Sequence, residues 1–403
     1  MAQGSGAPHE ALHRAAGLLQ QGAAGEALRI LKNIAAAEPT NSDALNLLGI
    51  ALAQAGDLVA AVDTLRRVTA LNPAHAGAHL NLANALRRLE RLPEAVEALR
   101  TAIALRPENP APHRLLAALL LDLRRFEEAV GAVDGVLARE PGFGAAWTMR
   151  GNALRALGRT AEAIASYERA IAADATDWDA LSGLGAVQLA ASNFPAAIEA
   201  YNRAAPLRPD DPAAYLGRAR AARGLGNPAA ALYDLDLALK CDPGLIDALS
   251  LRVAVLRDLN RREDAILDCD RLLDIDPANW DALNNRGVLL DEMGRPEEAL
   301  RCYERSLELN PSNPNAFQNM GTALLALGRG EEAVAKYDAA LSRDPLSVDT
   351  LNARGAALLA MRRFEAALES FERATAVSPA SAISQFHRAF PLLAMGRYVE
   401  GFE

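Results

Sequence analysis

One short stretch near the start of the sequence carries the residues of a zinc site. His9, Glu10 and His13 form the pattern HExxH, in which two histidines one helical turn apart bind zinc and the glutamate acts as general base. A zinc peptidase also needs an enclosing domain and, in one large class, a third histidine after a glycine. Neither accompanies the motif in this sequence. We therefore interpret the match as a coincidence and expect no metal site.

The other residue types that usually perform catalysis are not arranged for it. Cys241, Cys269 and Cys302 form no CxxC pair, which favours a reducing compartment without disulfides or a zinc framework. The sequence contains no GxxxxGK[ST] phosphate-binding loop and no GxSxG nucleophile elbow. We predict no catalytic residue and no cofactor within residues 1–403.

Composition and charge narrow the class of protein further. Hydrophobic residues make up 51% of the chain, so a large core can form, and the formal net charge of −9 argues against general nucleic-acid binding. No run of 18 apolar residues predicts a membrane span. The first ten residues lack the basic and apolar regions of a signal peptide. These features favour a cytoplasmic protein that binds neither nucleic acid nor membrane.

Alanine and proline recur along the chain at a spacing of 34 residues. If the repeating unit begins at Pro8, position 20 is alanine in all eleven repeats, and position 32 is proline in all but the repeat that holds Ala175. Position 8 is a small residue in every repeat except the one with Val253. Length alone would predict two or three domains, but an unbroken period favours one elongated domain of stacked repeats.

Each repeat has the pattern of two amphipathic helices. Apolar residues recur at positions 4, 7, 8 and 11, and again at positions 20, 21, 24, 27 and 28. Small residues at positions 8 and 20 allow the two backbones to approach closely. Glycine at position 15 of seven repeats suits a left-handed residue after the first helix, and Asn, Asp or Ser at position 34 suits an N-cap of the next one.

Together, the small residue at position 8, the alanine at 20, the aromatic or large apolar residue at 24 and the proline at 32 resemble the tetratricopeptide repeat (TPR). The resemblance implies an all-α fold, a right-handed α-solenoid of stacked antiparallel helix pairs. It divides the chain into a tail, residues 1–7, eleven repeats, residues 8–381, and a partial twelfth repeat, residues 382–403. It also implies that the first helices line a concave surface that holds a protein or peptide ligand.

Two groups of residues on that surface are candidates for ligand contact. By helical spacing, positions 2, 5, 6, 9, 12 and 13 of each first helix share the concave face. The basic group at these positions includes Arg88 and Arg114, and its candidate ligand residues are Arg87, Arg155, Arg220, Arg223 and Arg257. The amide group consists of Asn81, Asn84, Asn284, Asn285, Asn315, Gln318, Asn319 and Asn352. Amides donate and accept hydrogen bonds, so they can bind a peptide backbone whatever its side chains. Both groups also suit a solvated helix face, and the sequence does not decide which group dominates.

Asparagine at position 6 carries a second resemblance. Asn81, Asn285 and Asn319 resemble part of the asparagine ladder in the TPR arm of O-GlcNAc transferases, although other repeats break the ladder. The final residues, LLAMGRYVEGFE, resemble the junction before the catalytic domain of TPR glycosyltransferases, with Phe402 where tryptophan is usual. The residues of the carboxylate clamp of chaperone-binding TPR domains do not occur together. Two functions therefore stay open: a scaffold that binds an extended peptide, or the substrate-recognition domain of a protein glycosyltransferase whose catalytic domain lies beyond residue 403.

Arginine recurs at position 7, a site that normally packs against neighbouring helices. We expect the aliphatic stem to pack while the guanidinium group reaches acids on neighbouring second helices. The acids expected to serve are Glu168, Asp236, Asp270 and Glu304. This interpretation gives the position-7 arginines a structural role and leaves ligand contact to the residues of the concave face.

Overall fold

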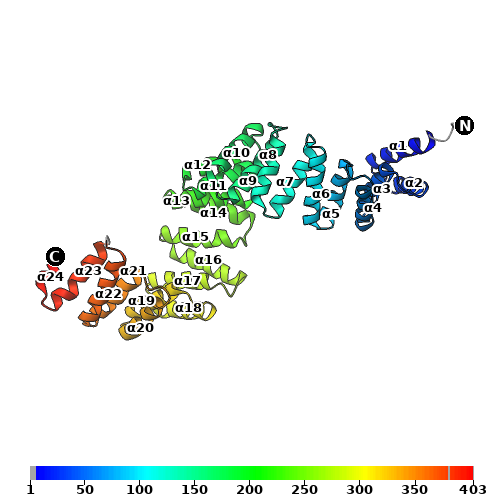
Figure 1. The fold of residues 1–403 in the computed structure, drawn as a ribbon. Coiled ribbons are helices and arrows are strands. Elements are labelled where there is room, and N and C mark those ends of the chain that lie inside the picture. The colour runs from blue at the N-terminus through cyan, green and yellow to red at the C-terminus, as the bar shows by residue number, and fades with distance from the viewer. Residues whose placement is uncertain (1–5, 380–381, 403) are drawn as a thin grey trace. The chain divides into compact units, whose positions relative to one another are not determined.

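A computed structural model describes residues 6–379 and 382–402 of the chain. These residues form helices throughout, with no strand among them, which confirms the predicted all-α fold (Figure 1). The helices gather in two compact halves, Met1–Arg208 and Pro209–Glu403, which we call the N-terminal and C-terminal halves. Most of the predicted tail lies outside the described residues, and the first helix begins at Gly6.

The helices alternate as first and second helices of successive repeats. Those of the N-terminal half are α1 (Gly6–Gln20), α2 (Ala24–Ala37), α3 (Ser42–Gln54), α4 (Leu58–Leu71), α5 (Ala76–Arg88), α6 (Leu92–Leu105), α7 (Pro110–Asp122), α8 (Phe126–Leu137), α9 (Gly144–Ala156), α10 (Thr160–Ala173), α11 (Trp178–Ala190), α12 (Phe194–Ala204) and the short 3-10 helix η1 (Ala205–Leu207). Those of the C-terminal half are α13 (Pro212–Gly224), α14 (Pro228–Cys241), α15 (Ile246–Asp258), α16 (Arg262–Ile275), α17 (Trp280–Glu292), α18 (Pro296–Leu309), α19 (Pro314–Ala326), α20 (Gly330–Leu341), α21 (Val348–Ala360), α22 (Phe364–Val377), α23 (Ala382–Ala394) and α24 (Tyr398–Phe402). Neighbouring helices pack in sequence order within each half, as in an α-solenoid.

The sequence signals at the helix ends act as predicted. The side chains of Asn41, Asp177 and Asn279, all at position 34, accept hydrogen bonds from backbone N–H groups in the first turn of the next helix, at 2.9 to 3.0 Å. The glycines at position 15 have φ between 72° and 92°, the left-handed conformation that ends a helix. Five repeats place other residues in this conformation, with φ between 56° and 61°: Glu90, Arg124, Ser192, Asn260 and Arg362.

Large aromatic residues at position 24 fill the space that small residues at position 8 leave. Tyr167 and Tyr303 are almost fully buried between the helices of their repeats. A Cβ atom on Gly151 would lie 2.6 Å from the ring of Tyr167, and one on Gly287 would lie 2.5 Å from the ring of Tyr303. The small residues are therefore required by the packing, as the sequence indicated.

The position-7 arginines tie consecutive repeats together. Arg252 donates to Asp236 of the preceding repeat at 2.8 Å and to both carboxylate oxygens of Asp268 in its own repeat. Arg286 contacts Asp270 in the same way, at 2.8 Å. The expectation for Asp236 and Asp270 is confirmed.

The other two acids named from the sequence, Glu168 and Glu304, form no such bridge within the described residues, and for them the expectation was wrong. The reason lies at position 7 of the repeats that follow them. These repeats carry Leu184 and Met320 there, so no guanidinium group is available to reach either glutamate.

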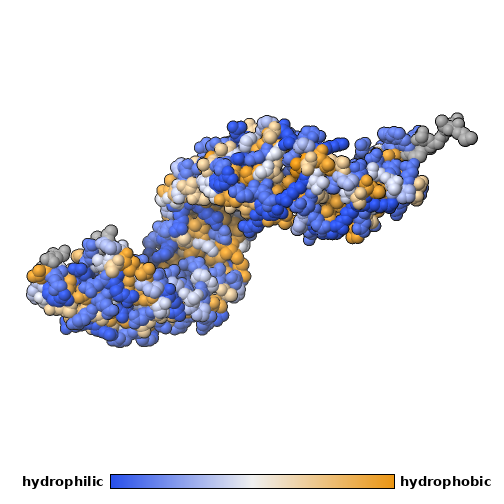
Figure 2. Space-filling model, in the orientation of Figure 1, coloured by the Kyte–Doolittle hydropathy of each residue, from blue (hydrophilic) through white to orange (hydrophobic). Residues whose placement is uncertain are grey.

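The face of each half that is visible in Figure 2 is mostly polar. Hydrophilic residues cover much of the visible surface of each half, and apolar residues appear between them in smaller areas (Figure 2). None of the described helices combines the length and the apolar character that crossing a membrane requires.

Candidate functional site

Within each half, positions 2, 5, 6, 9, 12 and 13 of the first helices share one side, which we call the first-helix face of that half. Three of the five predicted arginines form ion pairs with carboxylates on the next first helix: Arg220 with Asp247 at 2.8 Å, Arg223 with Asp258 at 2.8 Å and Arg257 with Glu292 at 2.6 Å. Arg87 and Arg155 form none within the described part of the chain. Most of the predicted basic group is therefore matched by acids of the protein itself.

The predicted amides make hydrogen bonds between repeats. Asn319 donates from Nδ2 to Oδ1 of Asn284 at 3.2 Å, and Asn81 donates in the same way to Asn46 at 2.9 Å. Both bonds join position 6 of one repeat to position 5 of the repeat before it. Asn284 is only 8% exposed, so its amide serves the contact between repeats more than it faces solvent. Asn285 donates within its own helix, to Asp281 at 3.2 Å.

The remaining amides are distributed between inter-repeat and local contacts. Gln318 accepts a hydrogen bond from Thr350 at 2.6 Å, and Asn352 donates to Ser384 at 3.1 Å. Asn84 bonds the carbonyl of Leu80 in its own helix at 3.2 Å. Asn315 is exposed, near the start of α19. The structure thus brings Asn284 together with Asn319. Asn81, Asn84, Asn285, Gln318 and Asn352 have separate partners, and Asn315 is exposed.

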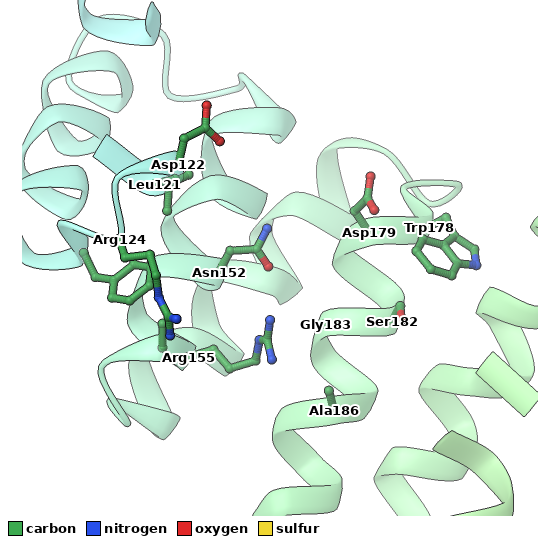
Figure 3. A pocket seen from close by; sticks show the side chains of 12 residues that line it. Leu121, Asp122, Arg124, Asn152, Arg155, Trp178, Asp179, Ser182, Gly183 and Ala186 are labelled. Atoms are coloured by element: carbon green, nitrogen blue, oxygen red, sulfur yellow. The ribbon is translucent and has the colours of Figure 1, made fainter. Parts of the chain in front are cut away.

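The first-helix face of the N-terminal half contains a hollow of about 790 Å³ (Figure 3). It lies over three consecutive first helices, α7, α9 and α11. Its lining consists of Leu121, Asp122, Arg124, Phe126, Asn152, Arg155, Ala156, Trp178, Asp179, Ser182, Gly183 and Ala186. Most of these residues occupy the positions predicted to face a ligand. Among the predicted site residues, Arg155 is the one that lines the hollow.

A buried tyrosine fixes the polar groups of the hollow. The Tyr167 hydroxyl donates to Oδ1 of Asn152 at 2.8 Å and interacts with Arg155 through a side-chain hydrogen bond. Burial raises the pKa of Tyr167, and the Arg155 cation only partly offsets this, so the hydroxyl stays protonated at neutral pH. Because Oδ1 of Asn152 is occupied by this donor, the Nδ2 group of Asn152 is left for a ligand.

Charges of both signs line the hollow but are separated within it. Figure 3 shows the guanidinium groups of Arg124 and Arg155 on one side, and the carboxylates of Asp122 and Asp179 pointing away from them. Asp179 lies 3.7 Å from Arg208, whose guanidinium carbon sits 4.1 Å from the centre of the Trp178 ring. Arg124 and Arg155 have no carboxylate within ion-pair distance in the described part of the chain. The hollow can therefore receive an anionic group beside the two arginines.

Three small residues on α11 make the hollow possible. Ser182, Gly183 and Ala186 stand at positions 5, 6 and 9, so all three positions carry small residues in this repeat, whereas some other repeats carry asparagine, glutamine, arginine or leucine at one or more of them. A Cβ atom on Gly183 would lie 2.6 Å from the ring of Tyr167, so this position admits only glycine while the tyrosine is in place. Sequence reasoning missed the hollow because it searched for polar side chains. The available signal was the loss of side-chain volume at three neighbouring positions.

The histidines and cysteines with possible chemistry lie elsewhere. The rings of His9 and His13 on α1 stack with their centres 4.6 Å apart. Cys269 is fully buried, as its position in the repeat predicted, and burial raises the pKa of its thiol to about 12. In the part of the chain that the structure describes, no group of three metal-ligating side chains comes together.

Comparisons with known proteins agree with this architecture. Models described as tetratricopeptide repeat match residues 18–73, 60–110, 114–177, 148–212, 182–246, 280–313, 302–335 and 352–400. No curated protein matches the sequence.

Three solved structures illustrate what the chain is similar to. A tetratricopeptide repeat protein from Parabacteroides merdae ATCC 43184 is 18% identical, covers 62% of this chain and 98% of its own, and superposes with a TM-score of 0.52. YrrB, a TPR protein with an unusual peptide-binding site, is 24% identical over 46% of this chain and 96% of its own, with a TM-score of 0.37. Naa15/Naa10 bound to HypK-THB matches at 14% identity over 98% of this chain and 67% of its own, with a TM-score of 0.47. At these identities the likeness concerns the fold alone.

Proposed function

The chain belongs to the tetratricopeptide repeat family, and we propose that it is a protein-interaction scaffold that holds an extended segment of a partner polypeptide on its first-helix face, with the hollow over α7, α9 and α11 as the main contact. The hollow is the observation that carries this proposal. The hollow is large enough for several side chains and is open along the first-helix face. The buried Tyr167 hydroxyl holds the side chains of Asn152 and Arg155 in place by hydrogen bonds.

The chemistry of the hollow suits binding better than catalysis. Its lining contains no histidine, cysteine or lysine, and its two aspartates point away from the guanidinium groups. Arginine and amide groups can recognise carboxylates and peptide carbonyls, while Trp178 and Phe126 offer apolar surface for side chains. A segment in extended conformation could follow the face across three repeats and contact all of these groups.

The amides on α17 and α19 are a second contact in this proposal. Asn285, Asn315 and Asn319 lie in the C-terminal half, and Asn319 keeps its Oδ1 for a ligand while its Nδ2 is bonded to Asn284. They would bind the backbone of the same partner or of another one. The cytoplasmic location and the role as the recognition domain of a glycosyltransferase both stay predictions from the sequence.

Selection from a displayed library of random dodecapeptides tests the proposal. We expect the whole chain to enrich a defined set of peptides, and Ala186→Trp to remove at least nine-tenths of their binding because the indole fills the hollow. Ala172→Trp is the matched control, since it adds the same side chain at an exposed site on the second helix α10. Both variants would be checked for unchanged helical circular dichroism. If no peptide is enriched, or if Ala186→Trp binds as well as the control variant, the hollow is not the binding site.

A further inference from the structure

From the charges of the hollow we infer that it selects for an acidic group: Arg124, Arg155 and Nδ2 of Asn152 hold a carboxylate of the bound polypeptide. This inference rests on the proposed function, because it specifies what kind of segment the first-helix face binds. It concerns a local feature of a chain whose formal net charge is −9, so it does not follow from the charge of the protein as a whole.

The first argument is the pairing of arginines along the face. Arg155, Arg223 and Arg257 occupy position 12. So does Arg87, which forms no ion pair within the described residues although Asp122 stands at position 13 of the next repeat. Arg223 and Arg257 reach acids at position 13 of the next repeat, Asp258 and Glu292. The repeat after Arg155 has Ala190 at position 13, so that position offers Arg155 no carboxylate. Arg223 and Arg257 are therefore paired with acids of the chain, whereas Arg155 is available to an acid of a ligand.

The second argument is the neighbour of Arg155. Arg124 follows α7 in a left-handed conformation, with φ of 56°, and its side chain enters the same side of the hollow (Figure 3). Two guanidinium groups on one wall repel each other, and a bound anion would relieve that repulsion. The guanidinium group also has the planar fork of donors that matches a carboxylate.

The third argument is the orientation of Asn152. Its Oδ1 accepts from Tyr167, so the group that remains for a ligand is a donor. The arginines and this amide therefore offer donors only on that wall. Asp122 and Asp179 lie on the other side, where they would repel a second negative charge. This arrangement favours a singly charged carboxylate over a phosphate dianion or a run of acids.

The test compares peptides selected by three forms of the whole protein: the natural sequence, Arg124→Gln with Arg155→Gln, and Arg362→Gln. Arg362 is the matched control, because it occupies position 15 like Arg124, is exposed, and has a similar φ of 60°. Two random libraries are used as probes. In one the peptide is joined to the display protein through its C-terminus, and in the other its C-terminus is free.

We expect Asp or Glu to be enriched at one aligned position of the selected peptides, and the enrichment to disappear with Arg124→Gln and Arg155→Gln but to persist with Arg362→Gln. Replacing that acid by its amide in a selected peptide should weaken binding to the natural protein about tenfold, as expected for a charge-assisted pair at a partly exposed site. Enrichment confined to the library with free C-termini would show that the carboxylate is the terminal one.

Failure of the inference can be told apart from failure of the proposed function. If peptides are selected and Ala186→Trp abolishes their binding, but no acid is enriched, the scaffold function stands and the acidic preference is refuted. The same conclusion follows if the double arginine variant keeps the enrichment. If no peptide is selected from either library, both proposals are refuted together.

Discussion

Replacing Arg252 by leucine should destabilise the C-terminal half, because this arginine satisfies a buried acid. The Asp268 side chain is 1% exposed, and Arg252 contacts both of its oxygens, at 2.7 and 2.9 Å, while reaching Asp236 in the preceding repeat at 2.8 Å. Loss of one partner of a fully buried ion pair costs about 3–5 kcal/mol. Arg252 is 21% exposed, and Arg271 would still contact Asp268 at 3.2 Å. We therefore expect a loss of about 2–3 kcal/mol after discounting for solvent screening.

A second substitution, copied from another repeat of the chain, should restore the free energy of unfolding that Arg252→Leu lowers. Repeat six carries Leu184 at position 7 and Ala200 at position 23, the places that Arg252 and Asp268 occupy in repeat eight. The double variant Arg252→Leu, Asp268→Ala copies this pair and removes the buried charge together with its partner. We expect its free energy of unfolding to lie within about 1 kcal/mol of the natural protein, since apolar replacements of buried ion pairs are often neutral.

Urea unfolding followed by tryptophan fluorescence measures these effects. Trp280, in the repeat that follows Arg252, is the one tryptophan of the C-terminal half, so its signal reports that half if Trp147 and Trp178 are replaced by phenylalanine. The slope of the free energy against urea should stay constant among the variants.

An exposed pair serves as the control for the Arg252 experiment. Arg305 and Glu308 lie 2.6 Å apart with side chains 57% and 62% exposed, so Arg305→Leu should change the stability by no more than about 0.5 kcal/mol. Two results would contradict this account of the Arg252 ion pairs. One is that Arg252→Leu lowers the free energy of unfolding no more than the control does, and the other is that the addition of Asp268→Ala fails to recover stability.

Two further predictions concern the turns and the amides. Ser192→Gly should stabilise the N-terminal half by up to about 1 kcal/mol, because Ser192 has φ of 58° and glycine adopts this conformation without steric cost; a lower midpoint of thermal unfolding would contradict this. Asn285→Ala combined with Asn319→Ala should weaken the binding of library-selected peptides if the amide stretch contacts the partner, and unchanged affinity in a titration would remove that role.

The periodic features of the fold could be predicted from the sequence because each depends on local rules repeated many times. Position 15 is the clearest example. Glycine in seven repeats indicated a left-handed residue, and the structure extends this to five repeats that lack glycine, such as those with Glu90 and Asn260. The register of the repeat fixes the conformation there even where the residue type does not favour it. The same register predicted apolar packing at position 24, where Tyr167 is buried, and contacts with neighbouring second helices at position 7, which Arg252 makes.

The candidate site was only partly predictable because it depends on relations between repeats. Helical spacing identified the face, and Arg155 was among the residues named. The spacing did not reveal which position-12 arginines reach an acid of the next repeat. Arg257 is paired with Glu292 at position 13, whereas the repeat after Arg155 has Ala190 at that position. Helical spacing also could not reveal that the ring of Tyr167 packs against Gly183 of the next repeat and that its hydroxyl group orients Asn152 by a hydrogen bond.

The stretches Asp177–Gly185 and Asn279–Gly287 show how one frame supports two different surfaces. Both begin with an N-cap and a tryptophan and end with a glycine that packs against a tyrosine. Where the later stretch has Asn284 and Asn285, the earlier one has Ser182 and Gly183. Asn284 joins neighbouring repeats and Asn285 bonds Asp281 in its own helix, whereas Ser182 and Gly183 line the hollow. A substitution that looks like the loss of binding groups in the sequence therefore creates the space in which, by our proposal, a partner is bound.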